Sequence, residues 1–440
     1  MISAGHLLKE AVRAQMSGSP KEAAFLYQQL LNQHPDNAAA LCNLGLIRQQ
    51  DKQYEEAEKL LRRAIAADAR FTDAYVNLTN VLHEQHRYDE AIGLCEEALK
   101  FASGNQYLLN NLATNLHGAG EHAKAIAVLE RVIAAHPGYS QGSYNIGKMY
   151  EATGNTDQAV RYYLQAARLK PRDATSLVAA GECLLKAGKA GDALAIFDRV
   201  LVLDAYDVRA LALKSLALAE LGQEDQERLL SDPGRLVRLH RLEELGLSPP
   251  EIAEFNRALS EFASNHPTMR EDPPDNATYN GWHSKNLAYD GHPAVEKLKK
   301  FIAYALDQRR RGLVDESRDH PFARSLPRNF GLNLWAVRMV AGGKMIPHIH
   351  TDGWLSGVYY VDVPGVVYDP EAGEAGWIKF GTPRNDIHLT RQTMTRTVRP
   401  EPGLLVTFPS YFWHDTIPLP EYNTEQRLCL AFDLEPKAVP

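Results

Sequence analysis

The 440-residue sequence has few cysteines, no long apolar run and no excess of basic residues. Its four cysteines form no CxxC pair, which argues against a disulfide framework or a cysteine zinc site and favours a reducing environment. The net charge of −7 gives no electrostatic reason to expect a nucleic acid or an anionic membrane as partner. No stretch approaches the roughly 20 apolar residues that span a bilayer, and the first residues lack the pattern of a secretory signal. We therefore expect a cytoplasmic protein.

A 34-residue period runs through the first half of the chain. Small residues recur at this period, which lets two antiparallel helices approach closely, and bulky residues recur with them and are expected to fill the space between successive hairpins. Period and residues match the tetratricopeptide repeat. We predict six units, 4–37 to 174–207, and a capping helix from about residue 208 to about Gln223. The small row is Ala23, Ala57, Ala91, Ala125, Ala159 and Ala193, and the bulky row is Tyr27, Leu61, Cys95, Leu129, Tyr163 and Phe197.

Stacked hairpins of this kind form a superhelix whose concave groove binds a peptide or partner protein. Four asparagines keep the repeat phase on the helix that is expected to line the groove. Their carboxamides can donate to and accept from an extended peptide backbone, and the row resembles the asparagine ladders of O-GlcNAc transferase. The alternative is that each asparagine bonds within its own hairpin. The four residues are Asn43, Asn77, Asn111 and Asn145.

The residues after the repeats change character. Ser248 before Pro249 predicts a helix start, and a second apolar face predicts a helix over about 293–308. From about Gly331 the period changes from 3.6 to 2, in short runs separated by Gly and Pro. The fold expected is an all-α tetratricopeptide solenoid followed by a double-stranded β-helix, or jelly roll, with supporting helices. We expect residues 1–225 to be the solenoid, 226–275 a helical linker and 276–440 the jelly roll.

A candidate metal-binding pattern lies in the expected β domain. His350 and Asp352 are two residues apart, and side chains two apart on a strand point the same way. His414, in FPSYFWHDT, would complete a set of two histidines and one carboxylate, which is diagnostic of non-heme Fe(II) oxygenases. Arg427 follows in the next strand, where its guanidinium would suit the far carboxylate of 2-oxoglutarate.

Four segments of the C-terminal third are similar to an Fe(II)/2-oxoglutarate oxygenase family that is often fused to tetratricopeptide repeats. The resemblance runs from about Tyr279 to Asp433. It implies Fe(II), O2 and 2-oxoglutarate as cofactor and cosubstrates, and hydroxylation as the reaction. The segments are NGWHSKNL, HIHTDGWLSGVYYVDVP, GLLVTFPSYFWHDTIP and QRLCLAFDL.

A third histidine leaves the ligand set open. His348 has the same strand parity as His350 and Asp352, so three groups compete for two places. We favour His350 and Asp352 as ligands, with His348 near the substrate. The alternative is an all-histidine set of His348, His350 and His414, as in some cupins. A cupin usually has a glutamate four or five residues after the second histidine, where this sequence has Trp354 and Leu355.

Two more residues are candidates for ligand binding. In related jelly-roll oxygenases a tyrosine at the place of Tyr360 often hydrogen-bonds the carboxylate that the arginine holds. Arg338, on the preceding strand, is a candidate contact of cosubstrate or substrate.

The hypothesis that follows is a dioxygenase that hydroxylates a protein or peptide bound in the repeat groove. A second hypothesis is a small-molecule hydroxylase whose repeats serve assembly. A third is a tetratricopeptide adaptor whose jelly roll is inactive.

Overall fold

The computed structural model describes residues 3–272, 277–314 and 320–437. The chain packs into two compact units, Met1–Ser176 and Leu177–Pro440. The expected boundary after residue 275 lies outside the described residues, and the one after residue 225 falls inside helix α14. The division into three segments therefore stays a prediction. None of the described helices combines the length and the apolar character that a bilayer-spanning segment needs.

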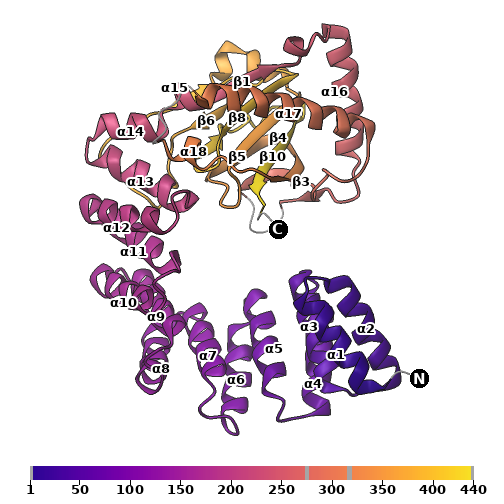
Figure 1. Cartoon of the computed structure of the whole chain (residues 1–440), viewed down its shortest axis with the longest axis vertical. Helices are drawn as coiled ribbons and strands as arrows, with labels where there is room; N and C mark the ends of the chain where they lie inside the picture. Colours follow the sequence, from indigo (N-terminus) through magenta and orange to yellow (C-terminus); the bar gives the residue numbers. More distant parts are fainter. Residues whose placement is uncertain (1–2, 273–276, 315–319, 438–440) are drawn as a thin grey trace. The chain divides into compact units, whose positions relative to one another are not determined.

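The first unit is a row of helical hairpins, as the 34-residue period predicts (Figure 1). Asn37, Asn105 and Asn155 begin three of the helices, and their side chains accept hydrogen bonds from backbone N–H groups of the first turn. The helices are α1 (Ala4–Met16), α2 (Pro20–Gln33), α3 (Ala38–Gln50), α4 (Tyr54–Ala67), α5 (Thr72–Glu84), α6 (Tyr88–Leu99), α7 (Gln106–Gly118), α8 (His122–Ala135), α9 (Ser140–Ala152) and α10 (Thr156–Leu169).

Glycines in the first helix of a hairpin allow the second helix to approach closely. A Cβ atom at Gly45 would lie 2.9 Å from Cγ of Leu61, and one at Gly147 would lie 2.7 Å from the ring of Tyr163. Leu61 and Tyr163 belong to the bulky row of the repeat, so the bulky residues fill space inside their own hairpins. This packing explains why a small and a large residue recur with the same period.

The second unit begins within the sixth hairpin and continues into the sheet domain. The expected capping helix is present as α13. Helix α16 begins after Ser248, as the sequence predicts, and the structure adds a capping box between Ser248 and Glu251. The helices are α11 (Thr175–Lys186), α12 (Ala190–Leu203), α13 (Val208–Glu220), α14 (Glu224–Ser231), α15 (Pro233–Leu236), α16 (Pro249–Ser264), α17 (Pro293–Val314) and α18 (Pro321–Arg324).

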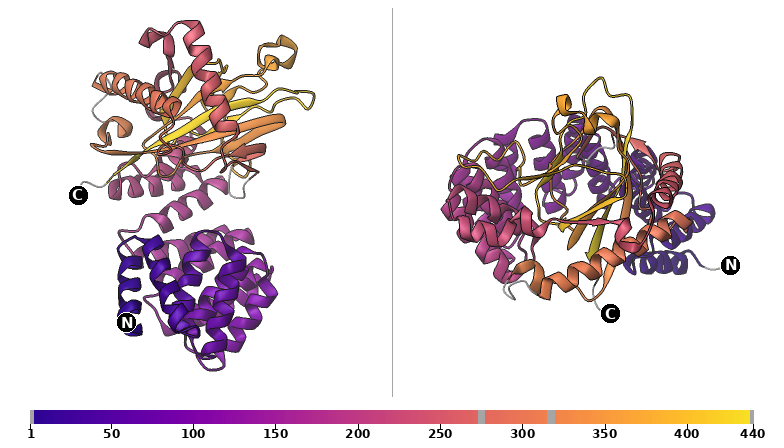
Figure 2. Two further views of the ribbon diagram at one scale, coloured as in Figure 1. Left: turned by 90° about the vertical axis from the view of Figure 1, so that its right-hand side faces the viewer. Right: turned by 90° about the horizontal axis from the view of Figure 1, so that it is seen from above.

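A curled antiparallel sheet forms the jelly roll (Figure 2). Its hydrogen-bonded order is β1-β8-β5-β10-β4-β9-β6-β7, with β3 on β4 and β2 on β3. The strands are β1 (Arg238–Arg241), β2 (Arg270–Glu271), β3 (Thr278–His283), β4 (Phe330–His348), β5 (Leu355–Asp362), β6 (Ile378–Phe380), β7 (Arg396–Val398), β8 (Leu404–Pro409), β9 (His414–Thr416) and β10 (Arg427–Pro436).

Strand β4 joins the two layers of the jelly roll. This strand contains Gly342 at a φ of 66°. Its first half pairs with β10, and its last residues pair with β9. The rings of Phe380 on β6 and Phe408 on β8 lie 4.9 Å apart, which brings the two layers together in one core.

Helices α16 and α17 cover the outer face of β5. The hydroxyl of Tyr359 donates to Oδ1 of Asn256 on α16, and the ring of Phe301 on α17 lies 6.1 Å from the Tyr359 ring. Because side chains alternate along a strand, Tyr360 points to the opposite face, into the interior of the jelly roll. Both faces of β5 are therefore buried.

Candidate metal centre

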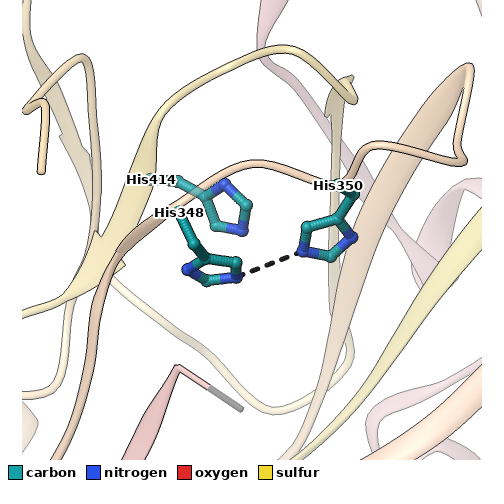
Figure 3. A group of neighbouring side chains, drawn as sticks. All are labelled: His348, His350 and His414. Carbon is teal, nitrogen blue, oxygen red and sulfur yellow. Dashed lines mark hydrogen bonds between the residues drawn. The ribbon is translucent and has the colours of Figure 1, made fainter. Parts of the chain in front are cut away.

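Three histidines meet at one end of the jelly roll (Figure 3). His348 is the last residue of β4 and pairs in register with His414, the first residue of β9. Their ring centroids lie 4.2 Å apart. His350 lies beyond the end of β4, and its ring is 5.1 Å from that of His348 and 5.0 Å from that of His414. One nitrogen from each ring lies within 4.8 Å of the other two.

Each ring uses its Nδ1 atom for a hydrogen bond away from the group. Nδ1 of His348 lies 2.9 Å from the carbonyl oxygen of Ile346, and Nδ1 of His414 lies 2.9 Å from that of Phe412. A carbonyl oxygen only accepts, so both Nδ1 atoms carry the proton. Nδ1 of His350 lies 2.6 Å from a carboxylate oxygen of Asp433. In the neutral rings, every Nε2 atom then has a free lone pair.

The free lone pairs face one another. Nε2 of His350 lies 3.2 Å from Nε2 of His348 (Figure 3). With the protons on the Nδ1 atoms, no hydrogen lies between these two nitrogens, and their lone pairs repel. A cation placed between the rings would turn the repulsion into three favourable contacts, and imidazole is a common ligand of iron, zinc, copper and nickel. The donor set therefore fits a divalent transition metal.

Burial keeps two of these imidazoles neutral, those of His348 and His414. It lowers the pKa of His348 to about 3, with the nearby His350 as a second cause. The pKa of His414 is held well below its usual range, first by burial and then by His348 and His350. Neutral imidazole is the form that binds a metal ion.

An open pocket of about 570 Å³ leads to the histidines. Polar groups line most of its wall, with the half-buried ring of Trp335 beside His350 at 5.7 Å. A molecule in the pocket could reach His348 and His350, which form part of the lining. Besides the histidines His348 and His350 and Trp335, the lining includes Ala277, His283, Ser284, Lys285, Asn286, Asn333, Met345, Ile349, Thr351, Asp352 and Asp433.

Asp352 lies in the pocket wall but outside the three-nitrogen group. The spacing of His350 and Asp352 predicts that both lie on one strand, whereas β4 ends at His348 and both residues follow it in the turn to β5. Strand alternation therefore does not direct the Asp352 side chain, which is exposed. The geometry favours the all-histidine alternative, in which His348 is a ligand.

A buried guanidinium lies on the inner face of β10. Arg427 is 2% exposed, and Nε donates to the carbonyl oxygen of Gly376 at 3.0 Å. It lies 5.0 Å above the ring of Tyr360, whose buried hydroxyl has no hydrogen-bond partner in the described part of the chain. The other contacts of the guanidinium are with the sulfur atoms of Met339 and Cys429, and no carboxylate among the described residues forms an ion pair with it. A buried charge without an anionic partner and a buried hydroxyl without an acceptor are costly unless a ligand supplies them.

Two parts of the chain match known protein families. Residues 333–433, from β4 to β10, match the family described as "Putative 2OG-Fe(II) oxygenase". Residues 14–82, 82–144 and 144–208 match tetratricopeptide-repeat families. The chain is a tetratricopeptide-repeat protein with a C-terminal domain of this oxygenase family.

Curated relatives are similar to this chain over limited lengths. Human "Protein O-mannosyl-transferase TMTC3" is 26% identical over 38% of this chain and 19% of its own length. "Cellulose synthase operon protein C" of Pseudomonas fluorescens is 22% identical over 61% of this chain and 20% of its own length. The chain thus spans about a fifth of either relative. The match to the solved structure of Pseudomonas aeruginosa pilF covers 47% of this chain and 94% of the pilF chain, at 18% sequence identity and a TM-score of 0.40.

The asparagine row of the repeats makes contacts between hairpins. Nδ2 of Asn77 lies 3.2 Å from Sγ of Cys42, and Nδ2 of Asn145 lies 2.7 Å from Oδ1 of Asn110. Nδ2 of Asn111 lies 3.0 Å from the carbonyl oxygen of Val76. Each donor thus reaches the preceding hairpin, which was not one of the two alternatives that the sequence suggested. Peptide binding by this row stays a prediction.

Arg338 lies apart from the histidines. Its guanidinium lies 4.1 Å above the ring of Trp282, its partner residue on β3. The neighbouring Met339 pairs with Arg427, so strand alternation puts Arg338 on the opposite face from Met339 and Arg427. Contact of Arg338 with the cosubstrate stays a prediction that this placement does not favour.

Asp433 was not predicted, although a signal for it exists. It lies six residues after Arg427 on β10, with the parity that places both side chains on the same inner face. It is 7% exposed and contacts His350. An acidic residue on the buried face of a strand that already carries a candidate ligand-binding arginine was the sequence clue.

Proposed function

We propose that this protein is an Fe(II)- and 2-oxoglutarate-dependent dioxygenase that hydroxylates a side chain of a protein or peptide substrate. The observation that carries the proposal is the convergence of three Nε2 lone pairs in an open pocket of a domain from an oxygenase family. Three protein ligands leave coordination positions for other groups, which is typical of catalytic rather than structural metal sites.

The proposed metal ligands are the Nε2 atoms of His348, His350 and His414. Bound there, iron with 2-oxoglutarate and O2 supplies the oxidative decarboxylation that yields succinate and CO2 and adds an oxygen atom to the substrate. Burial keeps the rings of His348 and His414 neutral, and the hydrogen bonds of the three Nδ1 atoms hold all three rings in one orientation. Asp352, in the pocket wall, is the competing ligand that the sequence suggested.

Arg427 and Tyr360 are the proposed binding groups for the far carboxylate of 2-oxoglutarate. The guanidinium lacks a carboxylate partner and the hydroxyl lacks an acceptor among the described residues. One carboxylate could accept from both groups, which removes two unfavourable buried donors at once. The charge of Arg427 would then be paired inside the jelly roll.

The substrate is proposed to be a protein or peptide because tetratricopeptide repeats generally mediate protein–protein interactions. The alternative substrate is a small molecule, since the pocket of about 570 Å³ has the volume of ordinary ligand pockets. The protein captured by the inactive His414→Ala variant decides between them. A mass gain of one oxygen atom on that protein, dependent on wild-type enzyme and 2-oxoglutarate, supports the proposal.

The activity test is succinate release from 2-oxoglutarate by the full chain with Fe(II) and O2. We expect His348→Ala and His414→Ala to abolish it and Asp352→Ala to retain iron binding. Loss of iron in Asp352→Ala, with iron retained in His348→Ala, would instead support the ligand set of His350, Asp352 and His414. If calorimetry shows that the wild type binds neither Mn(II) nor 2-oxoglutarate, the protein is an adaptor and the proposal is wrong.

A further inference from the structure

The three histidines of the site are oriented by different means. His348 and His414 belong to strands, and each ring donates to a carbonyl oxygen two residues earlier in its own segment. His350 lies outside any strand, and its ring contacts a side chain that is 83 residues away in sequence. Its orientation therefore depends on Asp433 and not on local backbone structure.

Asp433 is part of a closed ring of hydrogen bonds. The hydroxyl of Ser356 on β5 donates to Oδ1 of Asp433 at 2.6 Å. Ser356 thereby uses its proton, so the hydroxyl of Ser410, 2.8 Å away, donates to Ser356. The carbonyl oxygen of Ser410 accepts from the backbone N–H of His350 at 3.0 Å. The ring Nδ1–H of His350 closes the cycle by donating to Asp433.

The network is buried and has little room to change. Both serines are fully buried. A Cβ atom on Gly353, in the turn after His350, would lie 2.5 Å from Oγ of Ser410 and 3.3 Å from Oδ1 of Asp433. The turn thus packs directly against the network, and His350 is held through its ring and its backbone at once.

The charge of Asp433 has no cationic partner apart from the His350 ring. Among the described residues, the only ion pair of this carboxylate is the contact with Nδ1 of His350. A buried carboxylate needs compensation. A divalent cation on the other side of the imidazole would provide it, and a carboxylate behind a metal-binding histidine orients the ring and increases its basicity.

We propose that Asp433 is the positioning residue of the metal centre and acts through its hydrogen bond to His350. An all-histidine ligand set contains no carboxylate, and Asp433 supplies a negative charge behind one of the histidine ligands instead. This inference rests on the metal site of the proposed function. The hydrogen-bond network of Asp433, Ser356 and Ser410 has the role of fixing the tautomer of His350, so that its Nε2 atom points toward His348 and His414.

The test is the affinity of the full chain for Mn(II), measured by calorimetry, together with the visible spectrum of the Co(II) form. We expect Asp433→Asn to bind Mn(II) roughly 10- to 100-fold more weakly than wild type and to change the Co(II) spectrum. The matched control is Asp362→Asn, because Asp362 on β5 also accepts a serine hydroxyl, from Ser260 at 2.6 Å, without a histidine contact. The control should bind Mn(II) with wild-type affinity.

A second variant covers the case in which Asp433→Asn does not fold. Ser356→Ala keeps the carboxylate and removes one hydrogen bond to it, and we expect Mn(II) binding to weaken by a few-fold with an unchanged circular dichroism spectrum. Wild-type Mn(II) affinity in the folded Asp433→Asn variant, or in Ser356→Ala if the first is unfolded, overturns the inference alone. Absence of Mn(II) binding in wild type overturns the proposed metal site as well.

Discussion

The indole Nε1–H of Trp413 donates a hydrogen bond to the backbone carbonyl oxygen of Ala212 at 3.1 Å. Ala212 belongs to α13, the capping helix of the repeats, and Trp413 directly precedes the histidine that begins β9. Two residues earlier, the hydroxyl of Tyr411 donates to the carbonyl oxygen of Leu230 on α14 at 2.7 Å. Helices α13 and α14 therefore support the turn that leads into β9 and its first residue, His414.

We predict that a fragment of residues 226–440 is much less stable than one of residues 177–440. The shorter fragment loses α13 and with it the partner of Trp413, and each buried hydrogen bond that is lost costs about 1 kcal/mol or more. Thermal unfolding of both fragments, with Mn(II) binding as a second readout, checks this. Equal melting temperatures and equal metal affinity would contradict the role of the repeat helices and would support the boundary expected from the sequence.

Replacement of Tyr360 by phenylalanine is predicted to affect ligand binding but not folding. The hydroxyl has no partner among the described residues, so its removal leaves the free energy of unfolding of the ligand-free protein unchanged or higher. The affinity for 2-oxoglutarate should fall roughly 10-fold, as expected for one hydrogen bond to a charged group. Calorimetric titration and urea unfolding of the same variant measure both effects. A destabilised variant with normal 2-oxoglutarate affinity would show that Tyr360 is only a core residue.

Asn111→Ala is predicted to destabilise the repeats. The amide of Asn111 is 8% exposed and donates to Thr79 Oγ1 at 3.0 Å and to Asn80 Oδ1 at 2.8 Å, both in the preceding hairpin. Loss of these bonds should cost about 1–3 kcal/mol in the free energy of unfolding. Asn43→Ala, at the equivalent but less buried position of an earlier repeat, is the control and should cost less than about 0.5 kcal/mol. The opposite order, with weaker capture of a partner protein by Asn43→Ala, would favour the peptide-binding ladder.

Stability is predicted to decrease in weak acid because of His240 on β1. Its Nε2 atom contacts the Thr407 hydroxyl at 3.1 Å, and burial, with smaller effects of Arg309 and Arg238, lowers its pKa to about 4. In the unfolded chain the pKa of histidine is about 6.5, so between these values the unfolded state binds more protons. The stability contribution is therefore complete above about pH 6.5 and is lost as the pH falls toward 4.

At pH 5, protonation of His240 in the unfolded state lowers the free energy of unfolding by about 2 kcal/mol. Urea unfolding at pH 7 and pH 5, in wild type and in His240→Gln, measures it. The variant cannot titrate at this position, so its loss of stability between the two pH values should be smaller by that amount. The same pH dependence in both proteins would show that other groups cause the acid effect.

The repeat helices could be predicted from the sequence because their contacts are local and periodic. The small row that contains Ala57 and the bulky row that contains Leu61 keep their 34-residue spacing through the six predicted units, so one rule describes many contacts. The start of α16 at Ser248 was predictable for the same reason, since a helix cap depends on a few adjacent residues. The family resemblance correctly placed a domain of the oxygenase family in the C-terminal third of the chain.

The set of candidate metal ligands could not be predicted from local, periodic contacts. His348, His350 and Asp352 share a parity, and the choice between them depends on where β4 ends, which is decided by pairing with β9 across 66 residues of sequence. Asp433 escaped prediction because its contact with His350 joins β10 to a turn between other strands. A sequence repeat predicts contacts that recur in each unit, and the contact between Asp433 and His350 occurs once.

The amino-acid sequence by itself thus determined the solenoid, the change to strands near Gly331 and the set of candidate side chains, since these follow from local propensity and spacing. Only the tertiary structure decided which imidazoles face one another and which carboxylate stands behind them. The physical reason is that side-chain direction at a strand end depends on hydrogen bonds between strands that are distant in sequence.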